Sequence, residues 1–176
     1  MGIRNYLVEG VSGTGKTTVA EELQRRGYHV LHGDRELKYR GNPETGEPIE
    51  EPANLSKTEQ AAWGHQHLLW DMGKVEAALS DKSVPVSFFC GGCRNSHMFI
   101  DRLDGVFLLH VEDVNERFRR MDERVKRDPT DWGGEPEHKA LVSELHRTKA
   151  GLPESAIQID ATQPLGDVVE EILKHL

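Results

Sequence analysis

The sequence predicts an α/β fold in three layers: a five-stranded parallel sheet with helices on both faces. Two observations lead to this prediction. Five short apolar runs alternate with segments of helical spacing, a pattern typical of a parallel sheet covered on both faces. The chain has 176 residues, 36% of them hydrophobic and 30% charged, which suits one soluble domain with a full core. We therefore treat residues 1–176 as a single domain.

The five apolar runs define the predicted strands. Each run is short and contains β-branched, aromatic or leucine side chains, and each is bounded by glycine, proline or polar residues. The strands are predicted at residues 5–9, 28–31, 84–89, 105–111 and 156–160.

Helical spacing marks the segments between the strands. Val19, Ala20 and Leu23 lie on one face of the first helix, which Gly27 ends. Pro136 stands where the first turn of a helix tolerates proline. The helices are predicted at residues 16–26, 53–80 with a break near Gly64 or Gly73, 95–102, 112–127, from 136 onward, and 164–175.

Composition and charge exclude several classes of protein. No apolar run approaches the ~20 residues that span a bilayer, and the first ten residues do not resemble a signal peptide. Two cysteines are too few for a disulfide framework, so we expect a cytoplasmic protein without membrane partners. The net charge of −8 argues against binding to nucleic acid. A monomer and a homodimer are both compatible with the sequence.

A glycine-rich segment between the first strand and the first helix predicts nucleotide binding. It fits G-x-x-x-x-G-K-[ST] at every fixed position, in the strand–loop–helix context that this pattern requires. Its backbone N–H groups and the start of the helix favour phosphate, the lysine reaches the β- and γ-phosphates, and the Thr17 hydroxyl binds Mg²⁺. The fold is therefore of the P-loop NTPase type. The predicted nucleotide-binding residues are Gly10, Ser12, Gly13, Thr14, Gly15, Lys16, Thr17 and Thr18.

Asp34 follows the second strand, at the edge of the sheet where ligands bind. A carboxylate beside an acceptor hydroxyl can orient it and take its proton. Asp34 could instead hold a water bound to Mg²⁺, or serve as the N-cap of a short helix, since aspartate is a favoured cap.

Arginines follow the fourth strand at helical spacing. Arg117, Arg120, Arg124 and Arg127 fall on one helical face. Arginines folded over a phosphoryl-transfer transition state stabilise its spread negative charge. The alternative is a solvated face on which nearby acidic residues pair with these arginines. We expect at least one of Arg117, Arg120 and Arg124 to be catalytic.

The chain resembles the nucleoside-monophosphate-kinase-like small kinases, a group that includes shikimate and gluconate kinases. Gly33-Asp34 is similar to the Gly-Asp of adenylate and gluconate kinases. Residues 90–94, CGGCR, fall where adenylate kinases carry Asp-Gly-Phe-Pro-Arg, and residues 159–164, IDATQP, look like their adenine-contacting loop. The matches cover nearly the whole chain in order.

This resemblance implies a kinase that uses ATP and Mg²⁺, with a lid at residues 115–140 and an acceptor-side insertion at residues 41–80. It points to Arg117 as the best catalytic candidate and to Arg94 as an acceptor-binding arginine. Arg35 could also hold an acceptor phosphate, and Trp70, expected on the long helix, could stack on an acceptor ring or belong to the core. The implied adenine contacts are Thr162, Gln163 and Pro164.

The two cysteines, Cys90 and Cys93, stand in a C-x-x-C after the third strand. A zinc site needs about four ligands, and with His97 the segment offers three at most. A redox pair stays open as an alternative, since such pairs open a helix after a strand. Cys90 also replaces the aspartate that many P-loop proteins use for Mg²⁺, and a neutral thiol is a poor Mg²⁺ ligand.

The predicted loop at residues 41–52 bears on the acceptor. It carries four glutamates and no basic residue, which favours a neutral acceptor, a nucleoside or related hydroxyl compound. A nucleoside monophosphate is the alternative acceptor. An ATPase or a nucleotide-binding regulatory module without kinase activity is the alternative function.

Overall fold

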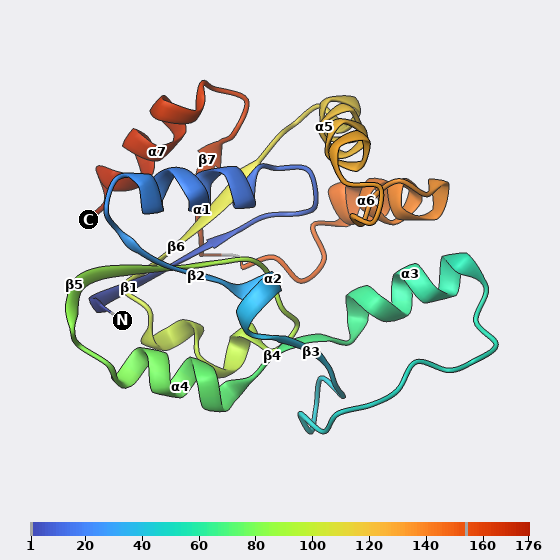
Figure 1. Ribbon diagram of the computed structural model, residues 1–176, viewed down its shortest axis with the longest axis horizontal. Helices are drawn as coiled ribbons and strands as arrows, with labels where there is room; N and C mark the ends of the chain where they lie inside the picture. The colour runs from blue at the N-terminus through green and yellow to red at the C-terminus, as the bar shows by residue number, and fades with distance from the viewer. Residues whose placement is uncertain (1, 154) are drawn as a thin grey trace.

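Five parallel strands form the central sheet of the computed structural model, which describes residues 2–153 and 155–176 (Figure 1). Their order across the sheet is β2-β5-β1-β6-β7, and every neighbouring pair is parallel. The predicted α/β fold with five parallel strands is therefore confirmed. The strands are β1 (Gly2–Glu9), β2 (His29–His32), β5 (Val84–Cys90), β6 (Gly105–His110) and β7 (Ile157–Asp160).

Helices cover both faces of this sheet. On one face lie α1 (Lys16–Arg25) and α7 (Leu165–Leu173), and on the other lies α4 (Met72–Ser80), as Figure 1 shows. Side chains alternate along β1 accordingly: Tyr6 and Val8 pack on the α1/α7 side, whereas Leu7 packs on the α4 side.

The acceptor-side insertion differs from the predicted long helix. It contains α3 (Lys57–Gln66), then the short strand β4 (Leu68–Trp70), and only then α4. The helix is interrupted between Gly64, in α3, and Gly73, in the first turn of α4, which agrees with the predicted break near one of them. The chain leaves helix at residues 67–71 because β4 pairs antiparallel with β3 (Lys38–Arg40) and buries Leu69 and Trp70.

Two further segments are shorter than predicted. The helix expected at residues 95–102 is a pair of single 3₁₀ turns, η1 (Ser96–Met98) and η2 (Ile100–Arg102). The helix α2 (Gly33–Glu36) has four residues. Asp34 lies inside α2, and the N-cap is His32, so the alternative of Asp34 as the N-cap is wrong.

The lid region consists of α5 (Val114–Arg127) and α6 (Pro136–Thr148), with proline in the first turn of α6 as predicted. In Figure 1, α6 lies beside α3, and an ion pair of 2.8 Å between Lys57 and Glu135 joins the two. Within the described residues, no helix is both long and apolar enough to cross a bilayer.

Candidate functional site

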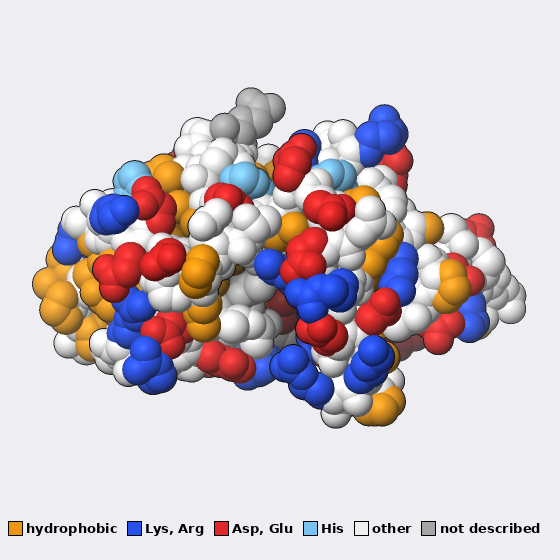
Figure 2. All heavy atoms as spheres, turned by 90° about the horizontal axis from the view of Figure 1, so that it is seen from above, with side chains coloured by type: hydrophobic (Ala, Val, Ile, Leu, Met, Phe, Trp, Pro, Cys, Tyr) orange, Lys and Arg blue, Asp and Glu red, His pale blue; other side chains and the backbone are white. Residues whose placement is uncertain are grey.

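A cavity of about 1300 Å³ opens at the carboxyl ends of the central strands. Its walls come from the glycine-rich loop, α2, β3, α3, the segment after β5 and the lid. Figure 2 shows the surface hollowed near its middle, with Lys and Arg side chains along the border, mixed with Asp and Glu. A typical site for one small ligand has ~300–1,000 Å³, so this cavity has room for a nucleotide and a second molecule.

The glycine-rich loop has the backbone that phosphate binding requires. Gly13 and Gly15 have φ of 84° and 100°, which a residue with a Cβ rarely adopts. Gly15 caps α1, whose first turn holds no acidic residue, so its N–H groups are free to meet an anion. Thr14 is buried, and its hydroxyl donates to the Val11 carbonyl at 2.9 Å, which fixes the curve of the loop.

Lys16 folds back over this loop. Its Nζ donates to the carbonyls of Gly10 and Val11. Burial lowers the pKa of Lys16, while the carboxylates of Asp34 and Glu9 oppose that effect. A phosphate entering the loop offers stronger acceptors than two peptide carbonyls, so the ammonium can exchange these partners for phosphate oxygens.

Glu9, the last residue of β1, is a site residue that sequence reasoning missed. It is 2% exposed, and its Oε2 has no hydrogen-bond partner among the described residues. Burial raises its pKa to about 7, against the lowering effect of Arg94 and Lys16. Because it lines the cavity, Glu9 is a carboxyl group able to exchange a proton near neutral pH. One signal was available: an acid ending an apolar strand directly before the glycine-rich loop.

The loop after β5 is built around Glu9. A Cβ on Gly92 would lie 2.2 Å from Glu9 Oε1, so glycine is required for this close approach. The Arg94 guanidinium lies 4.0 Å from the same oxygen. Arg94 is therefore a second positive group near Glu9, besides Lys16. It comes from the segment after β5 that the resemblance assigned to acceptor binding.

Asp34 and Arg35 line the cavity from α2. Asp34 is exposed, and its Oδ1 would lie 3.2 Å from a Cβ placed on Gly91. Arg35 is more open: its side chain is 63% exposed and its nearest acidic partner, Glu21, is 3.8 Å away. The structure thus brings Asp34 to the same cavity as Glu9 and Lys16, with Arg35 at the rim.

Trp70 does not line the cavity. It is fully buried and stacks on Phe99 and Phe89, with ring centroids 5.6 and 6.2 Å apart. The prediction that it contacts the acceptor needs correction, because β4 turns this side chain into the core beneath the site instead of presenting it from a helix.

The arginines of α5 occupy two different positions, one behind the phosphate loop and one at the cavity. Arg117 is buried behind the phosphate loop: its Nε donates to the Ser12 carbonyl at 3.4 Å, and its Nη1 lies 2.7 Å from Nδ1 of His146 on α6. Its backbone also packs on Gly13. Arg117 therefore supports the loop from behind, which corrects the expectation that it is the best catalytic candidate.

Arg120 and Arg124 face the cavity. Arg120 donates to Glu116 at 2.8 Å and to the Ala161 carbonyl at 3.0 Å. Arg124 pairs with Asp131 at 2.7 Å and donates to the Trp132 carbonyl, so it is held within the lid. Both side chains line the cavity that holds the phosphate loop, so the expectation that at least one of them is catalytic stays a prediction.

Asp160, the last residue of β7, stabilises the following loop through hydrogen bonds that its carboxylate accepts. Asp160 accepts from the Thr162 N–H and hydroxyl at 2.9 and 2.7 Å, and from Gln163 at 3.0 Å, which together hold its pKa at about 2. Gln163 borders the large cavity, whereas Thr162 and Pro164 do not line it.

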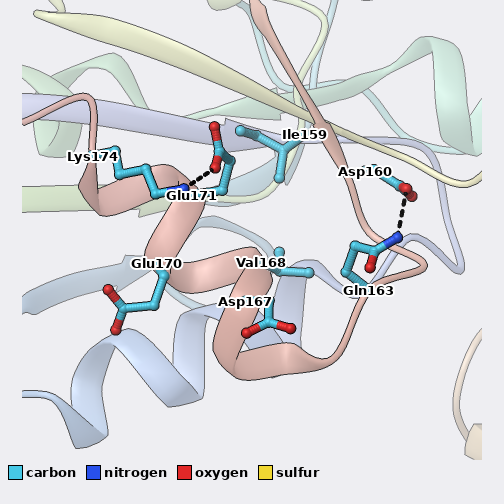
Figure 3. A pocket seen from close by; sticks show the side chains of 8 residues that line it. All are labelled: Ile159, Asp160, Gln163, Asp167, Val168, Glu170, Glu171 and Lys174. Carbon is cyan, nitrogen blue, oxygen red and sulfur yellow. Dashed lines mark hydrogen bonds and ion pairs between the residues drawn. The ribbon is translucent and has the colours of Figure 1, made fainter.

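A second, smaller cavity of about 440 Å³ lies on the α7 side of the same loop (Figure 3). Carboxylates dominate its lining: Asp160, Asp167, Glu170 and Glu171, with Lys174 paired to Glu171 at 2.7 Å. This negative charge disfavours phosphate, so the nucleotide belongs in the large cavity.

Cys90 and Cys93 are free, buried thiols on opposite sides of the sheet. Cys90 packs in the α1/α7 core and Cys93 in the α4 core. Burial raises the pKa of both thiols, so neither is a ready thiolate. Buried thiols in separate clusters disfavour the redox alternative, and no metal-holding group of three or more His, Cys, Asp or Glu occurs in the described part of the chain.

The donors in the cavity fit Mg²⁺, which takes one or two carboxylates together with substrate phosphates and water. The Thr17 hydroxyl is exposed in the cavity, and Glu9 supplies an unpartnered carboxylate oxygen. Asp34 stands nearby. An ion bound here would therefore meet hard oxygen donors in place of the thiol of Cys90.

Several solved structures of kinases that act on small molecules share this architecture. A gluconokinase from Sinorhizobium meliloti 1021 is 22% identical, with 98% of this chain and 90% of that chain covered and a TM-score of 0.52. The shikimate kinase from Acinetobacter baumannii in complex with shikimate is 21% identical, covering 97% and 91%, with a TM-score of 0.53. The deoxyadenosine kinase from M. mycoides with bound dATP is 15% identical, covering 97% of each chain, with a TM-score of 0.53.

At these identities the structures establish the fold. A search of curated proteins finds no match to this chain. The family profile of the AAA domain matches residues 7–141, from the middle of β1 to the second turn of α6, and the chain therefore belongs to this AAA domain family of P-loop proteins.

Proposed function

We propose that the protein transfers the γ-phosphoryl group of ATP to a hydroxyl of a small molecule. One observation carries this proposal: the cavity combines a phosphate loop with the buried Glu9 carboxyl, whose pKa of about 7 suits a general base at neutral pH. A phosphate loop serves many nucleotide-binding proteins, but a tuned carboxyl beside it supports transfer to a group that must lose a proton.

The reaction assigns a role to each side chain around Glu9. The acceptor oxygen attacks the γ-phosphorus, its proton passes to Glu9, the bond from the γ-phosphorus to the bridging oxygen breaks, and ADP leaves. Lys16 and Arg124 stabilise the charge on the transferring group, and Arg120 holds the nucleotide side. Asp34 orients the acceptor hydroxyl.

The Thr17 hydroxyl would hold Mg²⁺ together with the phosphates and water, which leaves the Glu9 carboxylate free to act as the base. The cation would supply neutralisation of the phosphate charge. The nucleotide is ATP on the strength of the loop after β7, where Gln163 would contact the base and Arg120 ties the loop to α5.

The acceptor is a hydroxyl-bearing small molecule of the nucleoside or polyol type. Of the four glutamates in residues 41–52, only Glu51 lines the cavity. The argument from this loop for an acceptor without an acidic group is therefore weakened.

The test is a screen of nucleosides, polyols and hydroxy acids with ATP and Mg²⁺, read by mass spectrometry for phosphorylated product. We expect a product with at least one acceptor, and a fall of roughly 10²- to 10³-fold with Lys16→Ala. Lys174→Ala, a surface change on α7, serves as the matched control. Formation of ADP at the same rate with and without every acceptor would mean an ATPase and would overturn the proposal.

A further inference from the structure

A buried arginine joins the last turn of α6 to the back of the phosphate loop. Arg117, on α5, is 2% exposed, and its Nε donates to the Ser12 carbonyl at 3.4 Å. Its Nη1 lies 2.7 Å from Nδ1 of His146, which stands in the last turn of α6. Three segments that are far apart in the sequence, the phosphate loop, α5 and α6, therefore meet at one guanidinium group.

The surroundings of this guanidinium offer it few partners. Burial lowers the pKa of Arg117, and among residues 2–153 and 155–176 no carboxylate forms an ion pair with it. Its Nη2 is also buried without a hydrogen-bond partner in this part of the chain. A buried charge is held in place by the few acceptors that it meets. The orientation of the Arg117 side chain thus depends on the Ser12 carbonyl and the imidazole of His146.

The contact with Arg117 fixes the protonation state of His146. A guanidinium has only N–H donors and stays charged, so Nδ1 of the imidazole is the acceptor, and the ring is neutral with its proton on Nε2. Burial lowers the pKa of His146, and the positive charges of Lys149 and Arg117 lower it further. Glu112 and Asp113, which precede α5, act in the opposite direction.

The segment that Arg117 contacts is the part of the loop that receives phosphate. A Cβ on Gly13 would lie 2.9 Å from the Arg117 carbonyl oxygen and 3.0 Å from its Cβ, so α5 and the loop are in close contact. The backbone N–H groups of such a loop point at the phosphate oxygens. The bond from Arg117 to Ser12 is long, so its strength depends on where the guanidinium is held. Displacement of this side chain would therefore alter the backbone that binds the nucleotide.

We propose that His146 is a positioning residue for nucleotide binding: its neutral imidazole holds Arg117 against the back of the phosphate loop. The inference concerns the same site as the proposed function, but it rests on nucleotide binding alone and not on phosphoryl transfer. His146 does not line the cavity, so its contribution passes through Arg117 and not through a contact with a ligand.

Calorimetric titration with Mg·ADP tests the proposal without any turnover. His146→Phe keeps a flat ring but removes the acceptor, whereas His146→Asn returns an acceptor oxygen near the position of Nδ1. We expect His146→Phe to weaken Mg·ADP binding by about 10-fold or more, the value of one hydrogen bond to a charged group, and His146→Asn to stay within about 3-fold of the unmodified protein. His29→Asn, at the exposed start of β2, is the matched control and should leave the affinity unchanged.

A double-mutant cycle separates action through Arg117 from general damage to the fold. Arg117→Met keeps much of the length of the side chain without its charge, and in that background His146→Phe should lose its effect on affinity. All titrations are made at a temperature at which circular dichroism shows each variant to be folded. An unchanged affinity in His146→Phe, a loss of affinity in His146→Asn equal to that in His146→Phe, or an equal effect of His146→Phe with and without Arg117 would overturn the proposal.

Histidine NMR on the nucleotide-free protein tests the contact itself and does not require His146→Phe to fold. Arg117→Met should raise the pKa of His146 by about 1 unit or more, because it removes a positive charge and the donor that favours the neutral ring. Arg119→Met, an exposed change on the same helix, should leave this pKa nearly unchanged. An unchanged pKa in Arg117→Met would overturn the inference. If Mg·ADP binds as expected but no acceptor is phosphorylated, the proposed function fails and the role of His146 stands.

Discussion

The two halves of the cavity are built in different ways. The phosphate half comes from one continuous segment, residues 9–18, in which strand, loop and helix follow one another. The acceptor half is assembled from β3, α3, the segment after β5 and the lid, which are separated by up to about a hundred residues of chain. The first is a local structure, and the second exists only after the insertion has folded against the sheet.

This difference has a physical consequence for specificity. The phosphate half uses backbone N–H groups and glycine conformations that recognise any nucleoside triphosphate. The acceptor half uses the charged ends of side chains, which can change without disturbing the sheet. In the proposed reaction, the backbone of the fold would select the phosphate donor, whereas replaceable side chains would select the acceptor.

The largest expected effect concerns Glu9, which stands where the two halves meet. Glu9→Gln should lower kcat by roughly 10²- to 10⁴-fold, because the general base is lost. In the unmodified protein, kcat/KM should fall as the pH drops below about 7, since Glu9 must be ionised to accept the proton. The measurement is a pH–rate profile of both proteins. Persistence of the acidic limb in Glu9→Gln would assign the base to another group.

The same substitution should stabilise the fold at high pH. The pKa of Glu9 is raised from 4.5 to about 7, so its favourable protonation is fully present below pH 4.5 and is lost as the pH rises through 7. At about 1.4 kcal/mol per pH unit, this interval corresponds to about 3 kcal/mol. Urea unfolding at pH 5 and pH 8 should show Glu9→Gln gaining stability over the unmodified protein between the two. Glu44→Gln, on the exposed loop, should gain none.

Next in size is the division among the arginines of α5. Arg124→Ala should lower kcat by roughly 10²- to 10³-fold with little change in Tm, because its guanidinium faces the cavity. Arg117→Ala should instead lower the free energy of unfolding by about 2 kcal/mol and raise the KM for ATP, because it removes the support behind Ser12.

Thermal unfolding and ATP kinetics on both variants measure this difference, with Arg147→Ala as an exposed control. A large loss of kcat in Arg117→Ala at an unchanged Tm would return Arg117 to the catalytic role that the spacing first suggested.

The smallest expected effect lies at the contact between the insertion and the lid. Lys57 and Glu135 are 2.8 Å apart, but their side chains are 68% and 54% exposed, so solvent screens the pair. A double-mutant cycle with Lys57→Gln and Glu135→Gln should give a coupling energy close to zero that decreases further with salt. A clear coupling energy that resists salt would show that the two segments close more firmly than this exposed contact implies.

The sequence predicted the phosphate half well because its signal is local. The sheet, its five strands and the glycine-rich loop follow from periodicity and spacing between near neighbours. The role of Glu9 was missed because it depends on burial. In the sequence Glu9 is only a polar residue at the end of a strand, and its removal from water becomes visible only in the folded structure.

The acceptor half was predicted less well, for two reasons. The run Leu68-Leu69-Trp70 fits a helix by its own pattern, and tertiary pairing with β3 overrides that pattern. Arg40 and Arg94 belong to separate predicted elements, and nothing in their spacing indicates that the backbone of Leu68 contacts both. Arg117 was placed on the correct helical face, but the sequence could not show that this face meets the back of the phosphate loop.

Trp70 has one further consequence. A Cβ on Gly33 would lie 2.0 Å from its Cζ2 atom, and a Cβ on Gly91 would lie 3.0 Å from the same atom. The indole is therefore a spacer of fixed length between the segment that carries Asp34 and the one that leads to Arg94. A fixed distance between these two segments would make the protein select acceptors by their length as well as by their charge.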